Sequence, residues 1–336
     1  MDNPVGIINQ FENKKILVVG DLILDSYLTG KVRRMSPEGI HPLIHVKRVK
    51  DKKYYVGGAC NVAYNLVDLG AETYLCGVIG EDSSGKKLIE MLLNKEVNTS
   101  LVVKDNDRST TEKERIIGIG TSGPEKIVRI DEEDSHPINE DIQKEILERF
   151  SKYLNKFDAV VVSDYKKGFV VKNIVSKLPE LARNRLVIVD TKQYDLNIFM
   201  KGFRFFKQNQ YEIEEITGLN SENLDDLKIK EIGAKLSEIF DYENVVMTCG
   251  ADGMIIYDKD GNHQHTKAIK SKEPYDVSGA GDTVAAVLSL ALSSEADIYN
   301  ACLIASHAAS IVIGKTGTAT VSKNELLGSL VNNYNQ

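Results

Sequence analysis

The sequence lacks several features that would assign it to particular classes of protein. Its four cysteines are widely spaced and form no Cys-x-x-Cys pair, which argues against a structural zinc site. Each cysteine lies among small or apolar neighbours, so we expect reduced and mostly buried thiols. No apolar run is long enough to span a membrane, and Met1–Lys15 contains no signal-peptide core. These absences predict a cytoplasmic protein without a membrane partner.

The sequence also lacks an excess of positive charge. Its 42 lysine and arginine residues are outnumbered by 49 aspartate and glutamate residues, and the net charge is −7. A surface that binds nucleic acid is basic, so this balance argues against a nucleic-acid partner. The basic residues are scattered, which leaves room for local positive pockets that bind anionic substrates. With 336 residues, the chain is long enough for one large α/β domain or two smaller ones.

Short apolar runs alternate with helical patterns along most of the chain. The runs that predict strands are Lys15–Gly20, Thr73–Ile79, Ala159–Ser163, Leu186–Asp190 and Asn244–Thr248. The patterns that predict helices are Asn61–Leu69, Gly85–Leu93, Asn139–Leu154 and Leu227–Phe240. Strands that alternate with helices form a parallel sheet with helices on both faces. The sequence therefore predicts an α/β fold with three layers and a mostly parallel central sheet.

Two segments depart from this alternation, roughly residues 26–56 and 109–130. Both contain alternating apolar and polar residues and no strong helical pattern, as in Pro42–Val49. We interpret both as antiparallel strands. Because both fall between α/β units, they are expected to pair into a small sheet that projects from the main domain and acts as a lid.

The most informative segment is the glycine-rich run Tyr275–Thr283, which precedes an apolar helix at Val284–Leu292. Its small residues allow the backbone to approach a ligand closely, and amides at a helix N-terminus favour anions. Asp282 follows directly, so its carboxylate can remove a proton from a hydroxyl held beside that anion. The alternative reading is an ordinary helix start, in which the carboxylate only complements the helix dipole.

Two signatures in the expected order resolve these alternatives. Asp276–Thr283 resembles the C-terminal signature of the PfkB carbohydrate kinases, a ribokinase-like family, and Val56–Ala63 resembles the N-terminal signature. The resemblance covers nearly the whole chain and implies a single ATP-dependent sugar kinase domain over residues 1–336. It implies that Asp282 is the catalytic base. It also implies that the amides of three residues form an anion hole, namely Gly279, Ala280 and Gly281.

The resemblance extends to positions that contact sugar in this family. Gly20–Asp25 resembles the segment whose acidic residues bind sugar hydroxyls, although Asp21 would also suit a turn. The sugar-binding residues implied in these segments are Asp21, Asp25, Gly57, Gly58 and Asn61.

The nucleotide side is implied by two further segments. Asn209–Glu212 resembles the family's Asn-x-x-Glu motif, which positions Mg²⁺ and the ATP phosphates. Because magnesium keeps much of its water, we expect Glu212 to hold it through water; alternatively Glu212 is one more acid of the helix at Tyr211–Ile216. The segment Thr248–Gly253 resembles the nucleotide loop and implies contacts from Thr248, Gly250 and Gly253. A monovalent cation is a common further cofactor in the family.

Three segments resemble those typical of heptose 7-phosphate kinases within the family. They are Arg34–Glu38 with Pro42, Val162–Gly168, and Val312–Val321. This likeness implies phosphorylation at O1 of D-glycero-β-D-manno-heptose 7-phosphate, on the route to ADP-heptose for lipopolysaccharide, with Asp164 in the substrate site. The candidates for binding the substrate phosphate are Lys113, Arg115, Arg129, Arg34 and Lys167. Each of these could instead be a solvated surface charge.

Several departures and alternatives remain open at this stage. Lys207–Gln208 stands where relatives have a proline before the asparagine, Lys166 replaces a common glycine, and Ser306 stands where asparagine is common. These departures leave the exact sugar open but not the reaction class, so another sugar or hexose phosphate remains an alternative. A separate alternative is an inactive regulatory module, and the intact Asp282, Asn209 and Glu212 argue against it. A dinucleotide-binding oxidoreductase is disfavoured, because no Gly-x-Gly-x-x-Gly follows the first strand.

Two expectations concern the assembly. Many relatives carry an adenylyltransferase domain, and its His-x-Gly-His signature is absent here, so the sequence predicts a kinase domain alone. Lid strands with exposed edges favour pairing between copies, and we expect a homodimer through the lid.

Overall fold

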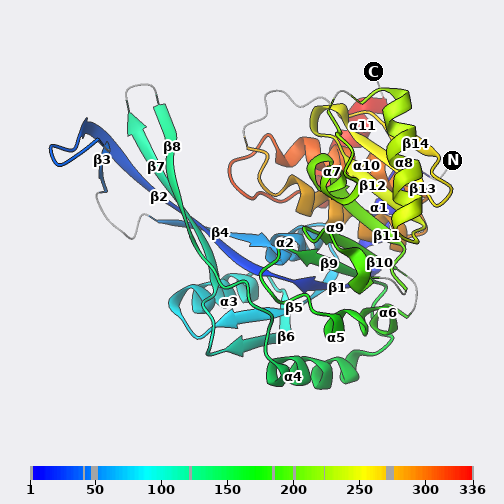
Figure 1. Ribbon diagram of the computed structural model, residues 1–336, viewed down its shortest axis with the longest axis horizontal. Coiled ribbons are helices and arrows are strands. Elements are labelled where there is room, and N and C mark those ends of the chain that lie inside the picture. Colours follow the sequence, from blue (N-terminus) through cyan, green and yellow to red (C-terminus); the bar gives the residue numbers. More distant parts are fainter. Residues whose placement is uncertain are drawn as a thin grey trace.

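The structure is a computed structural model of the chain (Figure 1). It describes residues 3–40, 42–46, 52–120, 123–183, 186–199, 202–222, 224–269 and 276–334. Within these residues, a body of strands and helices carries a smaller sheet that extends away from it.

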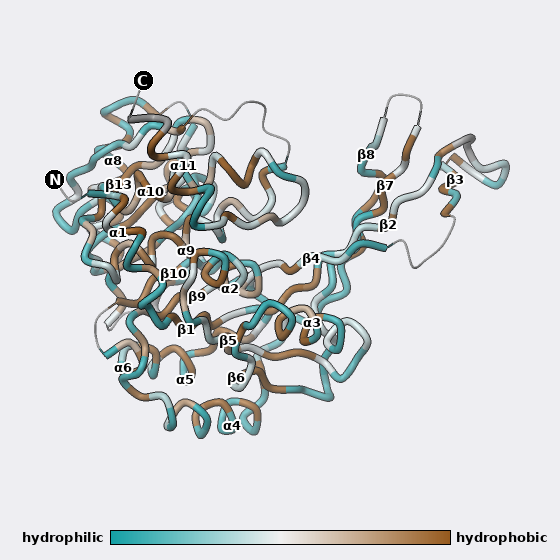
Figure 2. Tube along the Cα trace, turned by 180° about the vertical axis from the view of Figure 1, so that it is seen from behind, coloured by the Kyte–Doolittle hydropathy of each residue, from teal (hydrophilic) through white to brown (hydrophobic). Residues whose placement is uncertain are grey.

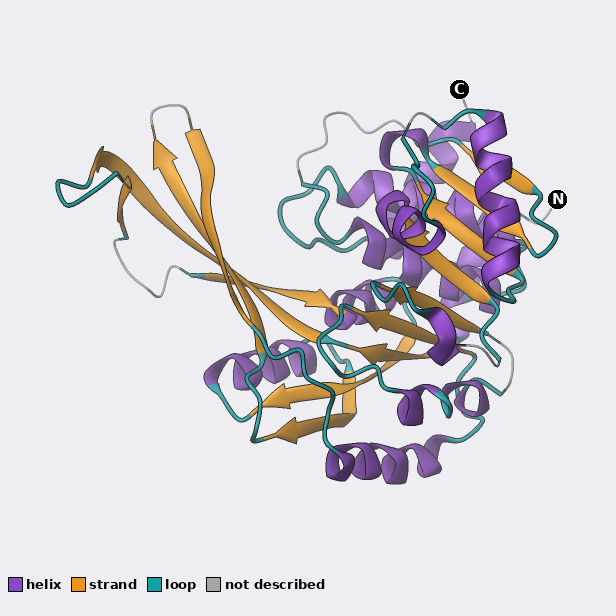
Figure 3. Cartoon of the chain, in the orientation of Figure 1, coloured by secondary structure: helices purple, strands orange, loops and turns teal. Residues whose placement is uncertain are grey.

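A nine-stranded sheet forms the centre of the described part of the chain (Figure 3). From edge to edge it contains β14 (His263–Thr266), β13 (Met254–Asp258), β12 (Asn244–Thr248), β11 (Phe205–Asn209), β10 (Val187–Thr191), β9 (Ala159–Asp164), β1 (Lys15–Gly20), β5 (Glu72–Gly80) and β6 (Asn98–Asp105). Neighbouring strands are parallel from β12 to β6. The pairs β12–β13 and β13–β14 are antiparallel. The mostly parallel sheet predicted from the sequence is thus confirmed.

Helices cover both faces of this sheet, which confirms the three-layer arrangement. One face carries α1 (Pro4–Asn9), α2 (Ala59–Asp68), α3 (Ser83–Asn94), α9 (Ala280–Ser293), α10 (Ile298–Val312) and α11 (Lys323–Tyr334). The other face carries α4 (Glu140–Phe150), α5 (Lys172–Val175), α6 (Leu178–Leu181), α7 (Gln210–Thr217) and α8 (Asp226–Ile239). Short 3₁₀ turns lie at Phe11–Asn13, Ser151–Tyr153, Leu196–Phe199 and Gly250–Asp252.

The central strands are apolar throughout because both of their faces are covered. In β1, Ile16 and Val18 pack into the core under α2 and α9, whereas Leu17 and Val19 pack into the core on the opposite face. Successive side chains of a strand point to opposite faces, so a doubly covered strand cannot alternate with polar residues. Figure 2 shows hydrophobic segments gathered in the strands and helices of the body.

The lid is a second, five-stranded sheet that projects from the body (Figure 1). Its strands are β3 (Pro42–His45), β2 (Leu22–Met35), β7 (Thr111–Gly120), β8 (Gly123–Glu132) and β4 (Lys53–Gly58), which pairs with β2. Three of its strand pairs are antiparallel, as expected from the sequence. The β2–β7 pair is parallel instead. The reason is that β2 follows β1 and β7 follows β6, so both strands leave the same edge of a parallel sheet in the same direction.

The cysteine thiols are free and buried, as the sequence predicted: Cys60, Cys76, Cys249 and Cys302. Among the residues that the structure describes, no helix combines the length and the apolar character needed to cross a bilayer.

Candidate active site

The carboxyl ends of the parallel strands bring the predicted site residues to one edge of the sheet. Asp21 follows β1, Asp164 ends β9, Asn209 ends β11 and Thr248 ends β12. The order of connections reverses at β1, which has β5 on one side and β9 on the other. In open α/β sheets, ligands bind in the crevice outside the carboxyl ends at such a reversal. The topology therefore places the candidate site at this edge.

Helix α9 brings Asp282 to this edge. The helix begins at Ala280, after Gly279, whose backbone φ of 82° lies in the left-handed region. A Cβ atom at position 279 would lie 2.5 Å from Nδ2 of Asn61, so glycine allows both the turn and this close approach. Asp282 lies in the first helical turn and is buried.

Two side chains hold the carboxylate of Asp282. Asn61 Nδ2 donates a hydrogen bond of 2.8 Å to Oδ2, and the Tyr165 hydroxyl donates one of 2.9 Å to Oδ1. The remaining side-chain atom of Asn61, Oδ1, is buried and has no hydrogen-bond partner among the described residues. A hydroxyl of a bound ligand would satisfy that atom next to the carboxylate.

The surroundings of Asp282 suit a base that works near neutral pH. Burial raises its pKa to about 6, and the charge of Asp190 adds to this, whereas the hydrogen bonds from Asn61 and Tyr165 lower it. At pH 7 the carboxylate is therefore mostly ionised, yet it takes up a proton far more readily than an exposed aspartate.

The predicted anion hole lies directly beside this carboxylate. The Ala280 amide donates to the carbonyl oxygen of Val277 at 3.3 Å, and Gly281 lines the cavity described below. Within the described residues, the amides of Gly279 and Gly281 have no hydrogen-bond acceptor. Free amides at a helix N-terminus favour a bound anion, so these two are the better candidates of the three predicted residues.

A buried lysine adds positive charge at the same place. Lys207 Nζ forms an ion pair of 2.8 Å with Asp190 Oδ2, and a Cβ atom at position 281 would lie 2.9 Å from Nζ. Burial alone would lower the pKa of Lys207, but the carboxylates of Asp190, Glu212 and Asp282 raise it above its ordinary value. The side chain is therefore cationic beside the anion hole.

Asn209 and Glu212 form a reciprocal cap at the start of α7. Asn209 Oδ1 accepts from the Glu212 amide at 2.9 Å, and Glu212 Oε2 accepts from the Asn209 amide at 2.8 Å. This cap fixes both side chains at the carboxyl end of β11. Burial, together with the charge of Asp190, raises the pKa of the Glu212 carboxyl. Both residues of the predicted motif are thus held beside Lys207.

This group of charges fits a divalent cation. The carboxylates of Asp190 and Glu212 both raise the pKa of Lys207, so two negative charges lie near this one ammonium. Among the described residues, no group of three or more His, Cys, Asp or Glu side chains is placed to hold a metal ion. Magnesium binds through one or two carboxylates with water and substrate phosphates, so such a partial site is appropriate for it.

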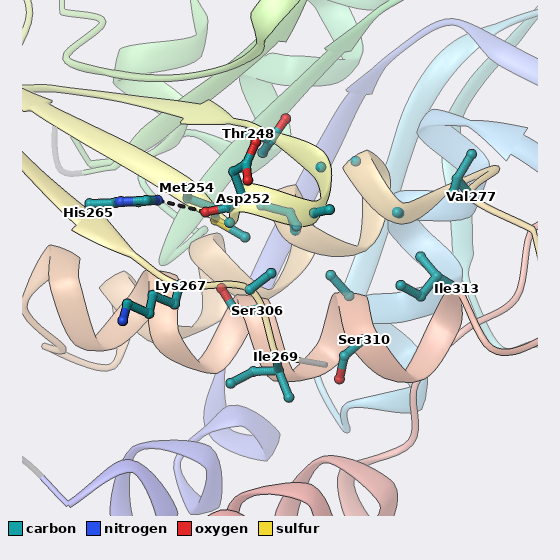
Figure 4. Close-up of a pocket in the computed structure, with 18 residues that line it drawn as sticks. Thr248, Asp252, Met254, His265, Lys267, Ile269, Val277, Ser306, Ser310 and Ile313 are labelled. Carbon is teal, nitrogen blue, oxygen red and sulfur yellow. Dashed lines mark hydrogen bonds between the residues drawn. The ribbon is translucent and has the colours of Figure 1, made fainter. Parts of the chain in front are cut away.

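A cavity of about 910 Å³, lined in part by Ala280 and Gly281, opens beside the predicted anion hole (Figure 4). It lies between the turn that joins β12 to β13 and the helices α9 and α10. Three predicted nucleotide-binding residues line it: Thr248, Gly250 and Gly253. Ser306 also lines it, and its buried hydroxyl has no partner among the described residues. An apolar cavity with a few polar groups suits a nucleobase and ribose, with phosphates toward Gly281.

On the sugar side, the glycines of the N-terminal signature allow close packing against Asp25. A Cβ atom at position 57 would lie 2.6 Å from Asp25 Oδ2, and Gly58 has a left-handed φ of 55°. Asp25 is buried and forms an ion pair with Arg115. Arg115 was predicted to contact a substrate phosphate, and Asp25 was predicted to bind the sugar. In the structure these two side chains form an ion pair with each other.

Asp21 and Asp164 are buried and engaged with the chain itself. Asp21 Oδ2 accepts from the amides of Tyr165 at 2.7 Å and Lys167 at 3.1 Å. Burial, together with the charge of Asp164, raises the pKa of Asp21 to about 7. Asp164 accepts hydrogen bonds from the Thr191 hydroxyl, the Gln193 amide group and the Lys166 amide. Both carboxylates thus organise the loop after β9.

Two lysines flank the ring of Tyr165. Lys192 Nζ lies 4.2 Å and Lys113 Nζ 5.7 Å from the ring centroid. Burial lowers the pKa of Lys113, and the charges of Lys192 and Lys167 lower it further. Among the described residues, neither Lys113 nor Lys192 has a carboxylate within ion-pair distance, whereas Lys167 pairs with Glu133 at 2.7 Å.

Two other predicted phosphate contacts do not join this cluster. Arg129 lies on β8, where it is exposed and pairs with Asp131 at 2.7 Å. The side chain of Arg34 lies outside the described residues.

Comparison with known proteins identifies the family. A profile described as "pfkB family carbohydrate kinase" matches residues 13–325. The chain belongs to this family. It is therefore an ATP-dependent sugar kinase with a ribokinase-like fold, and family members of this kind use ATP with Mg²⁺.

Relatives within the pfkB family carry a specific name. The chain is 37% identical over 318 residues to "Bifunctional protein HldE" of Helicobacter hepaticus and 38% identical over 316 residues to the protein of that name from Helicobacter pylori. These matches cover 94% and 93% of this chain but 64% and 65% of the relatives. The chain thus spans about two thirds of the length of these curated relatives.

Solved structures of pfkB-type kinases share the fold. Arabidopsis thaliana ribokinase, complexed with ribose and ATP, superposes with a TM-score of 0.72 at 20% identity, covering 94% of this chain and 98% of that one. Escherichia coli phosphofructokinase-2, with substrates and products, gives 0.73 at 18% identity, covering 95% and 99%. At these identities the likeness establishes the fold alone.

Four residues of the candidate site were not predicted from the sequence: Tyr165, Asp190, Lys192 and Lys207. Lys207 offered a signal, because it is a charged residue in an otherwise buried strand and stood out as a departure from relatives. Gln208, the other departure, has its side-chain amide 2.9 Å from Glu212 Oε2. Lys192 and Tyr165 offered little signal, since their proximity depends on the order of strands in space.

Proposed function

We propose that this chain phosphorylates a sugar that already carries a phosphate, namely D-glycero-β-D-manno-heptose 7-phosphate, at its anomeric O1. The observation that carries the proposal is the position of Lys113 and Lys192 over the ring of Tyr165, whose hydroxyl contacts Asp282. An acceptor hydroxyl beside Asp282 places the rest of the sugar within reach of these lysines. Sequence similarity to heptose 7-phosphate kinases and to the HldE proteins supports the choice of sugar.

The electrostatics of the lysine cluster support an anionic substrate. Lys113 is half-buried. Burial and the charges of Lys192 and Lys167 lower its pKa, and the charges of Asp25 and Asp131 offset only part of this. A phosphate dianion would relieve this repulsion and form charge-assisted hydrogen bonds. A free sugar would leave the repulsion in place. This favours sugar phosphates over unphosphorylated sugars.

In the proposed reaction, Asp282 accepts the proton of the acceptor hydroxyl while Asn61 and Tyr165 hold its two oxygens. The amides of Gly279 and Gly281 and the ammonium of Lys207 stabilise the charge of the transferred phosphoryl group. The nucleotide occupies the cavity beside Thr248. The lid sheet excludes water from the sugar, which limits hydrolysis of ATP.

The proposed magnesium ligands are Glu212, acting through water, and Asp190. Magnesium, when bound, neutralises charge on the ATP phosphates. Burial raises the pKa of Glu212 and the charge of Asp190 raises it too; a bound cation would offset both effects. A monovalent cation is a further proposed cofactor by family resemblance alone.

The product would be the 1,7-bisphosphate, on the route to ADP-heptose for lipopolysaccharide. Because the chain covers about two thirds of the HldE proteins, this route and a cytoplasmic location are parts of the proposal. The second candidate is a kinase for another sugar phosphate, such as a hexose phosphate, since the same lysines would bind its phosphate.

Kinetics with matched acceptors test the substrate. We expect heptose 7-phosphate to give a much higher kcat/KM than free heptose or fructose 6-phosphate. Lys113→Met and Lys192→Met should each raise the KM for heptose 7-phosphate on the order of tenfold and leave the KM for free heptose unchanged. Lys86→Met, on the exposed face of α3, is the control. A preference for free heptose, or equal effects on both acceptors, would contradict the proposed phosphate site.

We also propose that two copies associate through the lid. Ile119, Val128 and Ile130 on β7 and β8 are 41%, 51% and 53% exposed, and strands β3 and β8 lie at the edges of the lid sheet. Exposed apolar side chains and open edges favour association. Analytical ultracentrifugation should give twice the chain mass of 37.3 kDa. Ile130→Asp should give a monomer and Ile239→Asp, on α8, should not. A monomeric wild-type protein would refute the proposal.

A further inference from the structure

Tyr165 is an aromatic side chain in contact with the base, and the function proposed above leaves its contribution open. Its hydroxyl donates to Oδ1 of Asp282 at 2.9 Å, and Asn61 donates to the other oxygen at 2.8 Å. Each carboxylate oxygen therefore has one fixed donor. This arrangement determines the orientation of the carboxylate before a substrate arrives.

The loop that carries Tyr165 is built rigidly. The buried carboxylate of Asp21 accepts from the backbone amide of Tyr165 at 2.7 Å, and Asp164 accepts from the amide of Lys166 at 2.9 Å. Lys166 has a left-handed φ of 57°, a conformation that non-glycine residues rarely adopt. Gly168 has a φ of 82°, and a Cβ atom there would lie 1.9 Å from the carbonyl oxygen of His136.

The charge state of Tyr165 is fixed by the same surroundings. Burial raises the pKa of its hydroxyl well above the ordinary value, and the negative charge of Asp282 raises it further. The hydroxyl therefore stays protonated and can act toward Asp282 only as a donor. A donor stabilises the carboxylate over the carboxylic acid, and this hydrogen bond lowers the pKa of Asp282.

We propose that Tyr165 is a positioning residue that orients Asp282 and keeps it ionised near neutral pH. Without this hydrogen bond, burial would hold a larger fraction of Asp282 in its protonated form, which cannot take a proton from the acceptor. The same side chain presents its ring to Lys113 and Lys192, so one residue contacts both the base and the proposed phosphate site. This inference rests on the proposed role of Asp282 as the base.

The pH dependence of Tyr165→Phe tests the inference. We expect the acidic limb of kcat/KM to move to higher pH by on the order of one unit. The loss of kcat should be on the order of tenfold at pH 6.5 and smaller at pH 9, while ATP binding by titration stays unchanged. Tyr194→Phe is the control, because its ring contacts Lys166 and its side chain is exposed. An acidic limb at the wild-type position would overturn the inference.

A second substitution covers the case in which Tyr165→Phe does not fold. Incorporation of 3-fluorotyrosine at position 165 makes the hydroxyl a stronger donor and should move the acidic limb to lower pH. No movement, or movement to higher pH, would overturn the inference. Asp282→Asn separates the two proposals. If Asp282→Asn retains turnover, the proposed base is wrong. If it is inactive while both changes at Tyr165 leave the acidic limb of the pH profile in place, only the positioning role of Tyr165 fails.

Discussion

Replacement of Asp282 by asparagine should make the fold more stable while it removes activity. Burial raises the pKa of the Asp282 carboxyl from 3.8 to about 6. A group whose pKa is higher in the folded state than in the unfolded state binds protons more tightly when folded, so its contribution to stability falls as pH rises between the two values. Above about pH 6 the ionised carboxylate carries the full penalty. Asparagine is neutral and avoids it.

The size of the effect follows from the shift. A change from 3.8 to about 6 corresponds to about 3 kcal/mol at a pH above both values, and less than 1 kcal/mol near pH 4. The site can accept the amide, because the Tyr165 hydroxyl still donates to its oxygen. Asn61 Oδ1, which has no partner among the described residues, can accept from its nitrogen after the Asn61 amide rotates. We therefore expect the stability advantage of Asp282→Asn over the wild type to grow by about 2 kcal/mol between pH 4 and pH 8.

Urea denaturation followed by circular dichroism at about pH 4.5, 6 and 8 measures this gain. Asp260→Asn, at an exposed turn, is the control and should show no comparable pH-dependent difference. Turnover of Asp282→Asn should fall on the order of 10³-fold. An Asp282→Asn protein that is no more stable than wild type at pH 8, or whose advantage does not change with pH, would refute the reasoning.

Three further predictions follow from the site. The kcat/KM of the wild-type enzyme should fall about tenfold per unit below about pH 6, because protonated Asp282 cannot act as a base; a coupled assay that shows a flat profile down to pH 5 would contradict this. Gly279→Ala should destabilise the fold by about 1–2 kcal/mol and lower kcat, because the backbone φ is 82° and the added Cβ would lie 2.5 Å from Asn61 Nδ2. Thermal unfolding measures the loss of stability and steady-state kinetics measures kcat. A normal kcat would count against the tight packing. Lys207→Met should destabilise the fold by about 3–5 kcal/mol, because it leaves the Asp190 carboxylate unpaired. In urea denaturation, the double variant with Asp190→Asn should regain stability, but its kcat should stay low. Recovery of kcat in the double variant would remove Lys207 from the proposed mechanism.

The sequence predicted the central fold because its signals are local. A strand covered on both faces is apolar throughout, and the runs at 15–20 and 159–163 became β1 and β9. The segment of expected helix at 139–154 ended at Phe150 and continued as a 3₁₀ turn. Four strands of this sheet were not identified: β6, β11, β13 and β14. Strands β6 and β14 lie at the two edges, where strands carry more polar residues and a weaker pattern. Strand β11 is internal, but it ends in the polar run Lys207–Asn209, which interrupts its apolar pattern.

The sequence predicted the site less completely, because much of it depends on contacts between distant segments. Glycine-rich signatures located Asp282 and Asn61, which are 221 positions apart and hydrogen-bonded. The pairing of Asp25 with Arg115 depends on the adjacency of β2 and β7, which no local pattern encodes. The engagement of Asp21 by backbone amides is likewise a property of the folded loop.

The measurement that tests the account most directly is ³¹P NMR of the reaction with ATP, Mg²⁺ and heptose 7-phosphate. The account predicts a second phosphate ester signal that correlates with the anomeric proton of the sugar, formed by the wild-type enzyme and absent with Asp282→Asn. No new sugar phosphate signal, a signal that correlates with a different sugar proton, or equal formation by Asp282→Asn would contradict it.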